Sequence, residues 1–419
     1  MLPAPIRVEA VSPRAVTDPA GPTRRPPPRL KAGAGASLQP FMAMEVVARA
    51  NARQASLRPD EPRVIRLEVG QPGTGAPARA VAAAQRALAG GMPLGYTEAS
   101  GLPSLRARIA AHYGDFYGAS VPASRIAVTT GASGGFLLAF LAAFDCGDRI
   151  ALASPYYPPY VNILHALGMQ PVILEAGPDT RYQPTVALLE AMAAAGQGLP
   201  DGLIVASPCN PAGTTLDAAE LRALARFCDA NGIRLVSDEI YHGLNWDAPP
   251  ATACAFSDSA IVINSFSKYW SMTGWRVGWM VVPDDLAAAA LRLKQNLFIS
   301  APHISQVAAE AAFDATDEIA ANLERYRRSR AHLLEALPRA GLPDLLPAQG
   351  AFYIYADIGA RSLDSIGFCA RLLDEAGVAA TSGVDFDAAR GHRFVRFSYC
   401  GPEADMIEAT RRLAAFTGG

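Results

Sequence analysis

The sequence predicts an α/β protein, with a mostly parallel central sheet sandwiched by helices and a smaller α+β domain beside it. Three observations support this fold class. The chain has 419 residues, which is too long for a single hydrophobic core, so two or more domains are expected. Strand-like and helical runs alternate from about residue 81 to 298, which favours parallel strands covered on both faces. After residue 298, longer helices separate only a few strands, which indicates a second domain.

The strand-like runs of the first region are short and apolar, and helical segments such as 218–230 lie between several of them. Ligands of parallel sheets bind at the carboxyl ends of the strands, so the residues just after each run are candidates for a site. The runs cover residues 126–128, 149–152, 171–174, 203–205, 234–236, 261–263 and 279–282.

Composition and periodicity divide the chain into four segments. Residues 1–30 are rich in proline and arginine without an amphipathic period, which predicts a disordered or loosely docked arm. Residues 31–64 are expected to form the N-terminal part of the small domain, 65–298 the large domain, and 299–419 the rest of the small domain. Outside the large domain, helices are expected at 42–53, 317–337, 368–376 and from about 402, and strands at 63–69, 351–355 and 392–399.

The composition is that of an ordinary globular protein, with 18% charged residues and a formal net charge of −2. This balance gives no reason to expect nucleic acid or a membrane surface as a partner. No apolar run approaches the ~20 residues of a membrane span, and no secretory signal is evident at the start. The six cysteines form no C-x-x-C pair, so neither a metal site nor a disulfide framework is predicted. A cytoplasmic location is expected.

The most informative residue is Lys268, which lies just past the run 261–263. Ser265 and Ser267 precede it, and Arg276 follows between glycines. A lysine amine is a nucleophile for carbonyl compounds, pyridoxal phosphate among them. Small hydroxyl residues and an arginine beside the lysine suit an anionic phosphate. A lone lysine after a core strand would more often be a surface residue, but several positions agree here.

The stretch resembles the Schiff-base signature of the class I/II aminotransferases, which are pyridoxal-phosphate enzymes of fold type I. Their pattern S-x-S-K, a short spacer and G-W-R-x-G-W is matched closely here, and the resemblance extends from about residue 40 to the C-terminus. It implies a large domain that binds pyridoxal 5'-phosphate as an internal aldimine on Lys268. Ser265 and Arg276 are then among the cofactor-binding residues.

A carboxylate, Asp238, stands at the end of the run 234–236, and a buried carboxylate needs a partner. The protonated pyridine nitrogen of the cofactor would supply one. Asp238 is therefore expected to keep that nitrogen protonated, and Tyr241 to reach the phenolic oxygen, both as catalytic residues with Lys268. Taken alone, the segment is more typical of the acidic first turn of an exposed helix. The presence of Lys268 downstream favours the cofactor site instead. Glu239 is expected to be structural.

Two turns that follow strand-like runs complete the predicted cofactor site. Gly131, Ala132 and Ser133 begin an apolar helix whose free N–H groups suit a phosphate, and the family has a G-A-x turn here. Asn210 lies in a segment that resembles the family's S-P-x-N-P-T-G motif, although Ala212 stands where threonine is usual. The resemblance implies that Asn210 hydrogen-bonds the phenolic oxygen, and we expect it to border the substrate as well.

Four further residues are assigned roles by the resemblance. Tyr157, in a proline-rich stretch that could also be a simple loop, would stack on the pyridine ring. Arg396, flanked by apolar strand residues, would grip the substrate α-carboxylate, and Gly70 would lie near that carboxylate. Tyr96 would reach the phosphate of a neighbouring subunit, which implies a homodimer with shared active sites. Residues 73–77 depart from the family pattern, so the substrate-side loop is expected to differ.

The predicted function is an aminotransferase that exchanges an amino group between an L-amino acid and a 2-oxo acid. A β/γ-lyase with the same cofactor is the alternative, because such relatives share Lys268, Asp238 and Arg396. A ligand-sensing regulator would carry a DNA-binding domain before this fold, and the N-terminal arm is short for one. An inert scaffold would be expected to lose the lysine or the aspartate. The sequence does not reveal the amino donor, since no second arginine can be assigned to a side-chain carboxylate.

Overall fold

The computed structural model describes residues 30–418, so the predicted arm at residues 1–30 lies outside the described residues except for Leu30. The largest element is a seven-stranded sheet. Its strands in chain order are β2 (Ile126–Thr129), β3 (Arg149–Ala153), β4 (Gln170–Leu174), β5 (Gly202–Ala206), β6 (Arg234–Asp238), β7 (Ile261–Ser265) and β8 (Gly278–Val281).

The order of strands across this sheet is β2-β8-β7-β6-β5-β3-β4. Neighbours from β4 to β7 run parallel, whereas β8 runs antiparallel to both β7 and β2. The prediction of a mostly parallel central sheet is therefore confirmed. The exception is the predicted strand 279–282, whose direction the apolar pattern does not reveal.

Helices cover both faces of the sheet, and each face has its own core. Along β5, Leu203 and Val205 point to one core while Ile204 points to the other, as the alternation of side chains along a strand requires. The first face packs against α2 (Ala78–Ala89), α3 (Pro103–Tyr117), α6 (Val186–Met192), α7 (Ala218–Asn231) and α9 (His303–Ala312); the second packs against α4 (Gly131–Ala143), α5 (Pro159–Ala166) and α8 (Ala287–Leu297).

The smaller α+β part is built on a second sheet of four antiparallel strands in the order β12-β13-β10-β9. A parallel pair, β1 with β11, lies beside it. Its elements are α1 (Met42–Ser56), β1 (Ile65–Arg66), α10 (Thr316–Arg339), β9 (Asp344–Leu345), β10 (Tyr353–Asp357), α11 (Ser365–Ala376), β11 (Val378–Ala379), β12 (Thr381–Ser382), β13 (Phe394–Ser398) and α12 (Glu403–Gly418).

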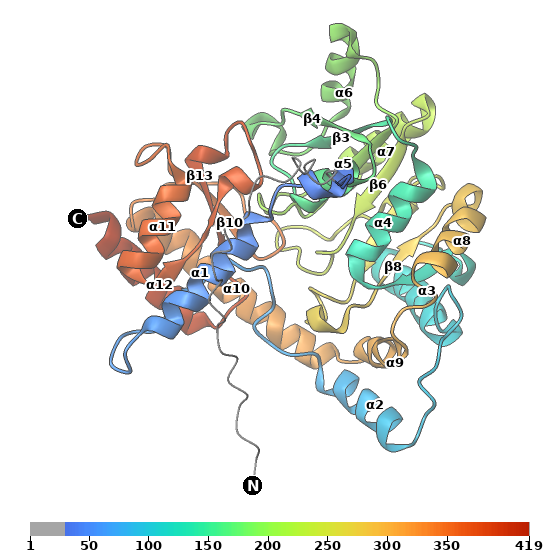
Figure 1. Cartoon of the computed structure of the whole chain (residues 1–419), viewed down its shortest axis with the longest axis horizontal. Helices are drawn as coiled ribbons and strands as arrows, with labels where there is room; N and C mark the ends of the chain where they lie inside the picture. Colours follow the sequence, from blue (N-terminus) through green and yellow to red (C-terminus); the bar gives the residue numbers. More distant parts are fainter. Residues whose placement is uncertain (1–29, 419) are drawn as a thin grey trace, which may run out of the picture.

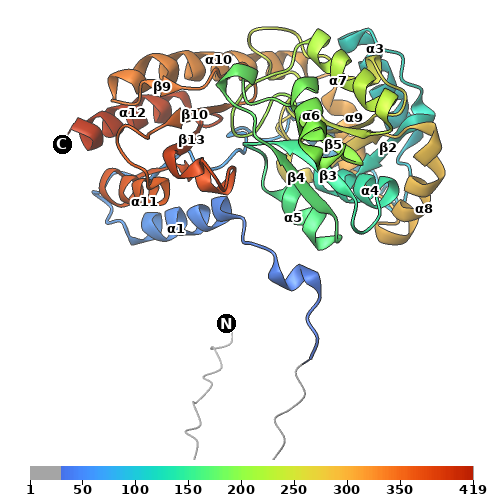
Figure 2. The same cartoon turned by 90° about the horizontal axis from the view of Figure 1, so that it is seen from above.

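The two parts are joined by the long helix α10 as well as by the chain between α1 and α2 (Figure 1). Ile319 near the start of α10 packs into the core of the large part, and Leu333 and Leu337 pack into the small one. Helix α1 lies along α11, as Figure 2 shows, and Ala50 packs against Leu373. Among residues 30–418, no helix is long and apolar enough to cross a bilayer.

One predicted strand is much shorter than expected. Residues 63–69 were expected to form a strand, but only Ile65–Arg66 pair in register with β11. Leu67 still makes backbone hydrogen bonds to Ala379 and Ser398, and the segment then leaves the small sheets and crosses toward the large part. The carbonyl oxygens of Glu68 and Gly70 accept hydrogen bonds from the side chains of Arg396 and Lys268 instead of from a neighbouring strand.

The topology of the large sheet explains why the predicted site residues lie at one of its edges. Strands β5, β6 and β7 are parallel, and β2 runs in the same direction because it is antiparallel to β8. Their carboxyl ends therefore meet at one edge. Helix α4 begins just after β2, Asp238 ends β6, and Lys268 follows β7 at this edge.

Candidate active site

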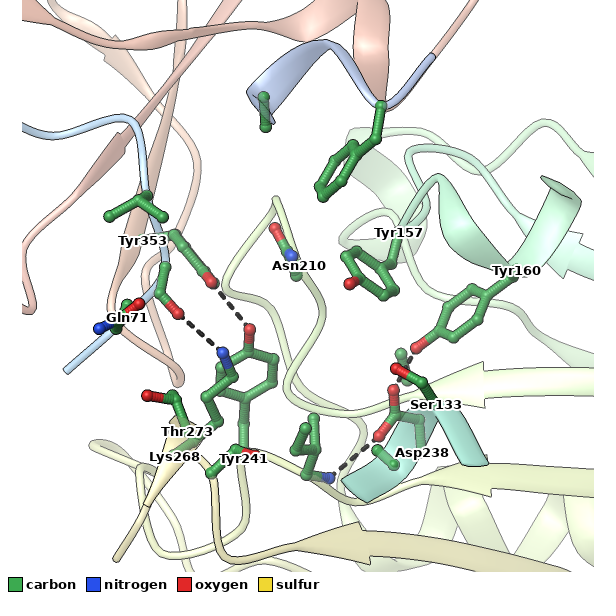
Figure 3. Close-up of a pocket in the computed structure, with 18 of the residues that line it drawn as sticks. Gln71, Ser133, Tyr157, Tyr160, Asn210, Asp238, Tyr241, Lys268, Thr273 and Tyr353 are labelled. Carbon is green, nitrogen blue, oxygen red and sulfur yellow. Dashed lines mark hydrogen bonds between the residues drawn. The ribbon is translucent and has the colours of Figure 1, made fainter. Parts of the chain in front are cut away.

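A cavity of about 270 Å³ lies at this edge, between the large sheet and the small part. Figure 3 shows the side chains that converge on it. Most of the predicted site residues line this cavity, namely Gly70, Ala132, Ser133, Tyr157, Asn210, Asp238, Tyr241, Lys268, Arg276 and Arg396. Residues far apart in the sequence are thus brought together at one place.

Lys268 extends from the loop after β7, and its Nζ donates a 2.7 Å hydrogen bond to the Gly70 carbonyl oxygen. Burial lowers the pKa of this amine from 10.5 to about 8, because the charged form loses hydration. Only the uncharged amine attacks a carbonyl group, so the burial makes Lys268 a better nucleophile near neutral pH.

Asp238 is buried at the end of β6, where burial raises the pKa of its carboxyl group to about 6. Its Oδ1 accepts a 3.0 Å hydrogen bond from the Ile240 N–H, and its Oδ2 accepts one from the Tyr160 hydroxyl. Neither partner carries a positive charge. A buried carboxylate with only neutral donors is suited to a cationic N–H group in the cavity.

Tyr241 and Tyr353 join the large and small parts within the cavity (Figure 3). Their hydroxyl oxygens are 2.8 Å apart, and both side chains are buried. Gly70 lies directly against Tyr353, because a Cβ at position 70 would come within 1.7 Å of Tyr353 Oη. A side chain at position 70 would therefore displace Tyr353.

Arg396 on β13 is buried and held in place on several sides. Its Nη1 donates to Asn210 Oδ1 at 2.8 Å, and its Nη2 donates to the Glu68 carbonyl oxygen at 2.6 Å. The guanidinium carbon lies 4.5 Å from the centre of the Tyr353 ring and 4.7 Å from that of Phe386. Such fixing leaves a planar, charged donor ready for a carboxylate.

The start of α4 and Arg276 form another side of the site. Gly131 has a φ of 72°, and a Cβ there would lie 2.4 Å from Arg276 Nη2. Glycine therefore lets the guanidinium approach the first turn of the helix closely. Ser133 is exposed, and the first-turn N–H groups have no partners within the helix. This combination of cation and helix N-terminus suits an anion.

Three of the predicted residues are placed differently. Gly131 and Ser265 lie behind the cavity wall; Ser265 Oγ is 2.9 Å from Ser267 Oγ, and it is Ser267 that lines the cavity. Tyr96 is 81% exposed and lies outside this chain's cavity. The roles of Gly131, Ser265 and Tyr96 in binding the cofactor therefore stay predictions.

The match to known proteins agrees with this geometry. Residues 62–413 match the family model described as aminotransferase class I and II. The chain belongs to the class I and II aminotransferase family. The predicted resemblance and the predicted enzyme class are thereby confirmed.

Relatives of this aminotransferase cover nearly its whole length. A valine–pyruvate aminotransferase of Mycobacterium tuberculosis is 47% identical over 91% of this chain and 97% of its own. A crystal structure of an aminotransferase from Mycobacterium tuberculosis has a TM-score of 0.89 at 46% identity, covering 93% of this chain and 100% of the other. The aspartate aminotransferase of Thermus thermophilus with maleate has a TM-score of 0.84 at 30% identity, covering 92% and 99%.

The residues of this aminotransferase fit pyridoxal phosphate. The buried carboxylate of Asp238 lacks a cationic hydrogen-bond partner that a protonated pyridine nitrogen would provide. The site also offers an amine for the aldehyde, on Lys268, and a cation at a helix N-terminus for the phosphate. Among residues 30–418, no cluster of three or more His, Cys, Asp or Glu side chains is arranged to hold a metal ion.

Sequence analysis missed the roles of Tyr160 and Tyr353 in this aminotransferase. Tyr160 is the second residue of α5, and its ring centre lies 5.4 Å from that of Tyr157, which precedes the helix, so helical spacing does not predict this contact. Tyr353 lies in an apolar run whose pattern predicts only a buried strand. Its contact with Tyr241 joins two distant segments, so no local signal predicts it.

Glu239 was predicted to be structural, and its surroundings are consistent with that prediction. It is buried outside the cavity, and its Oε1 accepts hydrogen bonds from the Thr252 hydroxyl at 3.1 Å and the Ala253 N–H at 2.8 Å. Burial raises the pKa of its carboxyl group to about 8. The neighbouring carboxyls Asp238 and Glu239 therefore point to different surroundings and serve different purposes.

Proposed function

We propose that this aminotransferase carries pyridoxal phosphate on Lys268 and transfers the amino group of a small apolar L-amino acid, valine in particular, to pyruvate or a similar 2-oxo acid. One observation carries the proposal: the amine of Lys268, the carboxylate of Asp238 and the guanidinium of Arg396 border the same cavity. The valine–pyruvate aminotransferase at 47% identity supports the choice of substrates.

Each residue has a distinct task in this proposal. Asp238 would keep the pyridine nitrogen protonated, while Tyr241 and Asn210 would donate to the phenolic oxygen and Tyr157 would cover a face of the ring. When bound, the cofactor supplies an electron sink for the substrate α-carbon. Lys268 Nζ would take up the α-proton of the amino acid as a general base. Its lowered pKa suits that role near neutral pH.

The wall on the substrate side supports an apolar amino acid. Phe41, Ala43 and Met44, at the start of α1, line the cavity together with Val69. The N–H groups of Met42 and Ala43 donate to the carboxylate of Asp385 at 3.2 and 3.0 Å, and thereby hold this helix start over the site.

Among the described residues, this wall offers no further cation for the side-chain carboxylate of a dicarboxylic substrate. Among the described residues that line the cavity, the only lysine and arginines are Lys268, Arg276 and Arg396. The proposal assigns all three to the cofactor or to the α-carboxylate. A dicarboxylic donor would bring a side-chain charge without a partner, which is costly to bury.

A panel of donors and acceptors tests the proposal. With the loaded enzyme, valine is expected to convert the bound cofactor to its amine form at least about tenfold faster than aspartate at equal concentration. The cofactor's absorbance reports each half-reaction, and pyruvate should reverse it. Faster conversion by aspartate would contradict the assigned donor. Release of ammonia from the donor without any 2-oxo acid would favour the β/γ-lyase alternative.

Arg396→Lys tests the carboxylate site. We expect the KM for valine and for pyruvate to rise together, because both bear the same α-carboxylate and lysine replaces a planar fork poorly. The cost is on the order of 2–5 kcal/mol, or less where lysine substitutes in part. Cofactor affinity should stay unchanged, and Arg393→Lys, at an exposed position just before the same strand, serves as the control. Normal substrate affinity in Arg396→Lys would refute the assignment.

We also propose that two copies of the chain form a homodimer in which Tyr96 reaches the partner's phosphate site. Tyr96 is too exposed to serve the cavity of its own chain. The His303 ring nitrogen lies 3.0 Å from the Gly95 carbonyl oxygen and ties the loop of Tyr96 to α9, and exposed apolar side chains occur at the ends of α2 and α8. These exposed residues are Leu88, Met92, Leu297 and Ile299. Exposed apolar side chains of this kind favour a subunit interface.

A further inference from the structure

We propose that Tyr353 is a positioning residue that acts through Tyr241: its hydroxyl orients the Tyr241 hydroxyl toward the cofactor's phenolic oxygen. This inference rests on the proposed function, because it presupposes the cofactor on Lys268. It implies that a residue of the small part of the molecule influences the cofactor, which the large part would hold.

Three contacts converge on Tyr353. Its hydroxyl is 2.8 Å from that of Tyr241, and its ring lies beneath the Arg396 guanidinium at 4.5 Å. Its Oη fills the space beside Gly70, whose carbonyl oxygen accepts from Lys268. The side chain is 1% exposed, so water does not compete for these contacts.

The direction of the hydrogen bonds follows from the number of protons. Each phenol has one proton to donate, and burial raises the pKa of both Tyr241 and Tyr353, so both stay protonated. If Tyr241 donates to the cofactor's phenolic oxygen, its own oxygen is left as an acceptor. Tyr353 must then donate to Tyr241. A chain of two hydroxyl donors polarises and strengthens the terminal hydrogen bond.

The expected consequence is a shift in the pKa of the nitrogen through which Lys268 holds the cofactor. The phenolic oxygen bears more uncompensated negative charge once that nitrogen has lost its proton. A stronger donor to the oxygen therefore favours the deprotonated form and lowers the pKa. Loss of the Tyr353 hydroxyl weakens the donor, so the pKa should rise.

Other charged or titratable groups also face this region but are unaltered in Tyr353→Phe. Those near the Lys268 amine and the Tyr241 hydroxyl are Cys400, Arg396, Arg276, Asp238 and Tyr157. A tyrosine-to-phenylalanine substitution removes one oxygen and leaves all formal charges in place. A change in titration can then be assigned to the hydroxyl.

The test is a pH titration of the absorbance of the bound cofactor in full-length, loaded protein. In Tyr353→Phe the midpoint is expected to rise by roughly 0.3–1 pH unit, and by more in Tyr241→Phe. The double variant should titrate like Tyr241→Phe alone, because Tyr353 acts only through Tyr241. Tyr355→Phe is the control: it removes a buried hydroxyl of the same strand that has no hydrogen-bond partner among the described residues, and no shift is expected.

Two results would overturn the inference: an unchanged midpoint in Tyr353→Phe, or a double variant shifted well beyond Tyr241→Phe. Both would leave the proposed function intact. A wild-type protein that shows no cofactor bound to Lys268 would instead remove the proposed function, and the inference with it. The two failures are therefore distinguishable in the same set of samples.

Discussion

Lys268→Ala is expected to lower the transamination rate by a factor of roughly 10⁴ or more. The proposal gives this amine two tasks, as the attachment point of the cofactor and as the base that moves the substrate α-proton. Its burial and lowered pKa suit both. No other lysine lines the cavity among residues 30–418, so no neighbouring side chain can take over. Turnover of valine and pyruvate by the loaded protein measures the effect.

Lys268→Arg tests whether the amine itself is required, and not only a positive charge at this position. Arginine keeps a cation at this position but is not deprotonated in proteins, so it can act neither as the nucleophile nor as the base. We expect it to be as inactive as the alanine variant. Activity within about tenfold of wild type in either variant would contradict the role of Lys268.

Asp238→Asn is expected to reduce the rate of α-proton removal by roughly 10²–10⁴-fold while the cofactor still binds. The amide oxygen can still accept from the Ile240 N–H, so the local structure should persist. What is lost is the negative charge that would pair with the protonated pyridine nitrogen in a buried place. Rapid mixing with valine, followed by the cofactor's absorbance, measures this step.

Glu239→Gln is the matched control for that variant. It also converts a buried carboxyl to an amide, one position along the chain, but outside the cavity. Because burial raises the pKa of Glu239 to about 8, this carboxyl is largely uncharged at neutral pH, and glutamine keeps the accepting oxygen. We expect a near-normal rate. A near-normal rate in Asp238→Asn as well would remove Asp238 from the mechanism.

The fold could be predicted from the sequence because its strands are buried on both faces and are separated by helices. The apolar pattern does not reveal the direction of a strand or the strand with which it pairs. The run 279–282 gives the same signal whether it is parallel or, as β8, antiparallel. The run 63–69 is extended as expected, yet the carbonyl groups of Glu68 and, just past the run, Gly70 accept from side chains of the site, and local sequence does not distinguish these two uses of extended backbone.

The candidate site was predictable wherever a residue follows a strand in a compact motif, as Lys268 and Asp238 do. Contacts between distant segments were not. The link between Tyr241 and Tyr353 and the capping of α1 by Asp385 depend on how the small part docks on the large one. In our proposal the choice of substrate depends on that same docking, since most of the apolar wall comes from the start of α1.

The most direct test of the account is borohydride reduction of the loaded protein followed by peptide mapping. The structure provides an internal comparison: Lys294 on α8 is a second buried lysine, and burial lowers its pKa to about 8 as well, but it lies outside the cavity. The account predicts that the cofactor is fixed on Lys268 and that Lys294 stays unlabelled. A label on Lys294 or any other lysine, with Lys268 free, would contradict it.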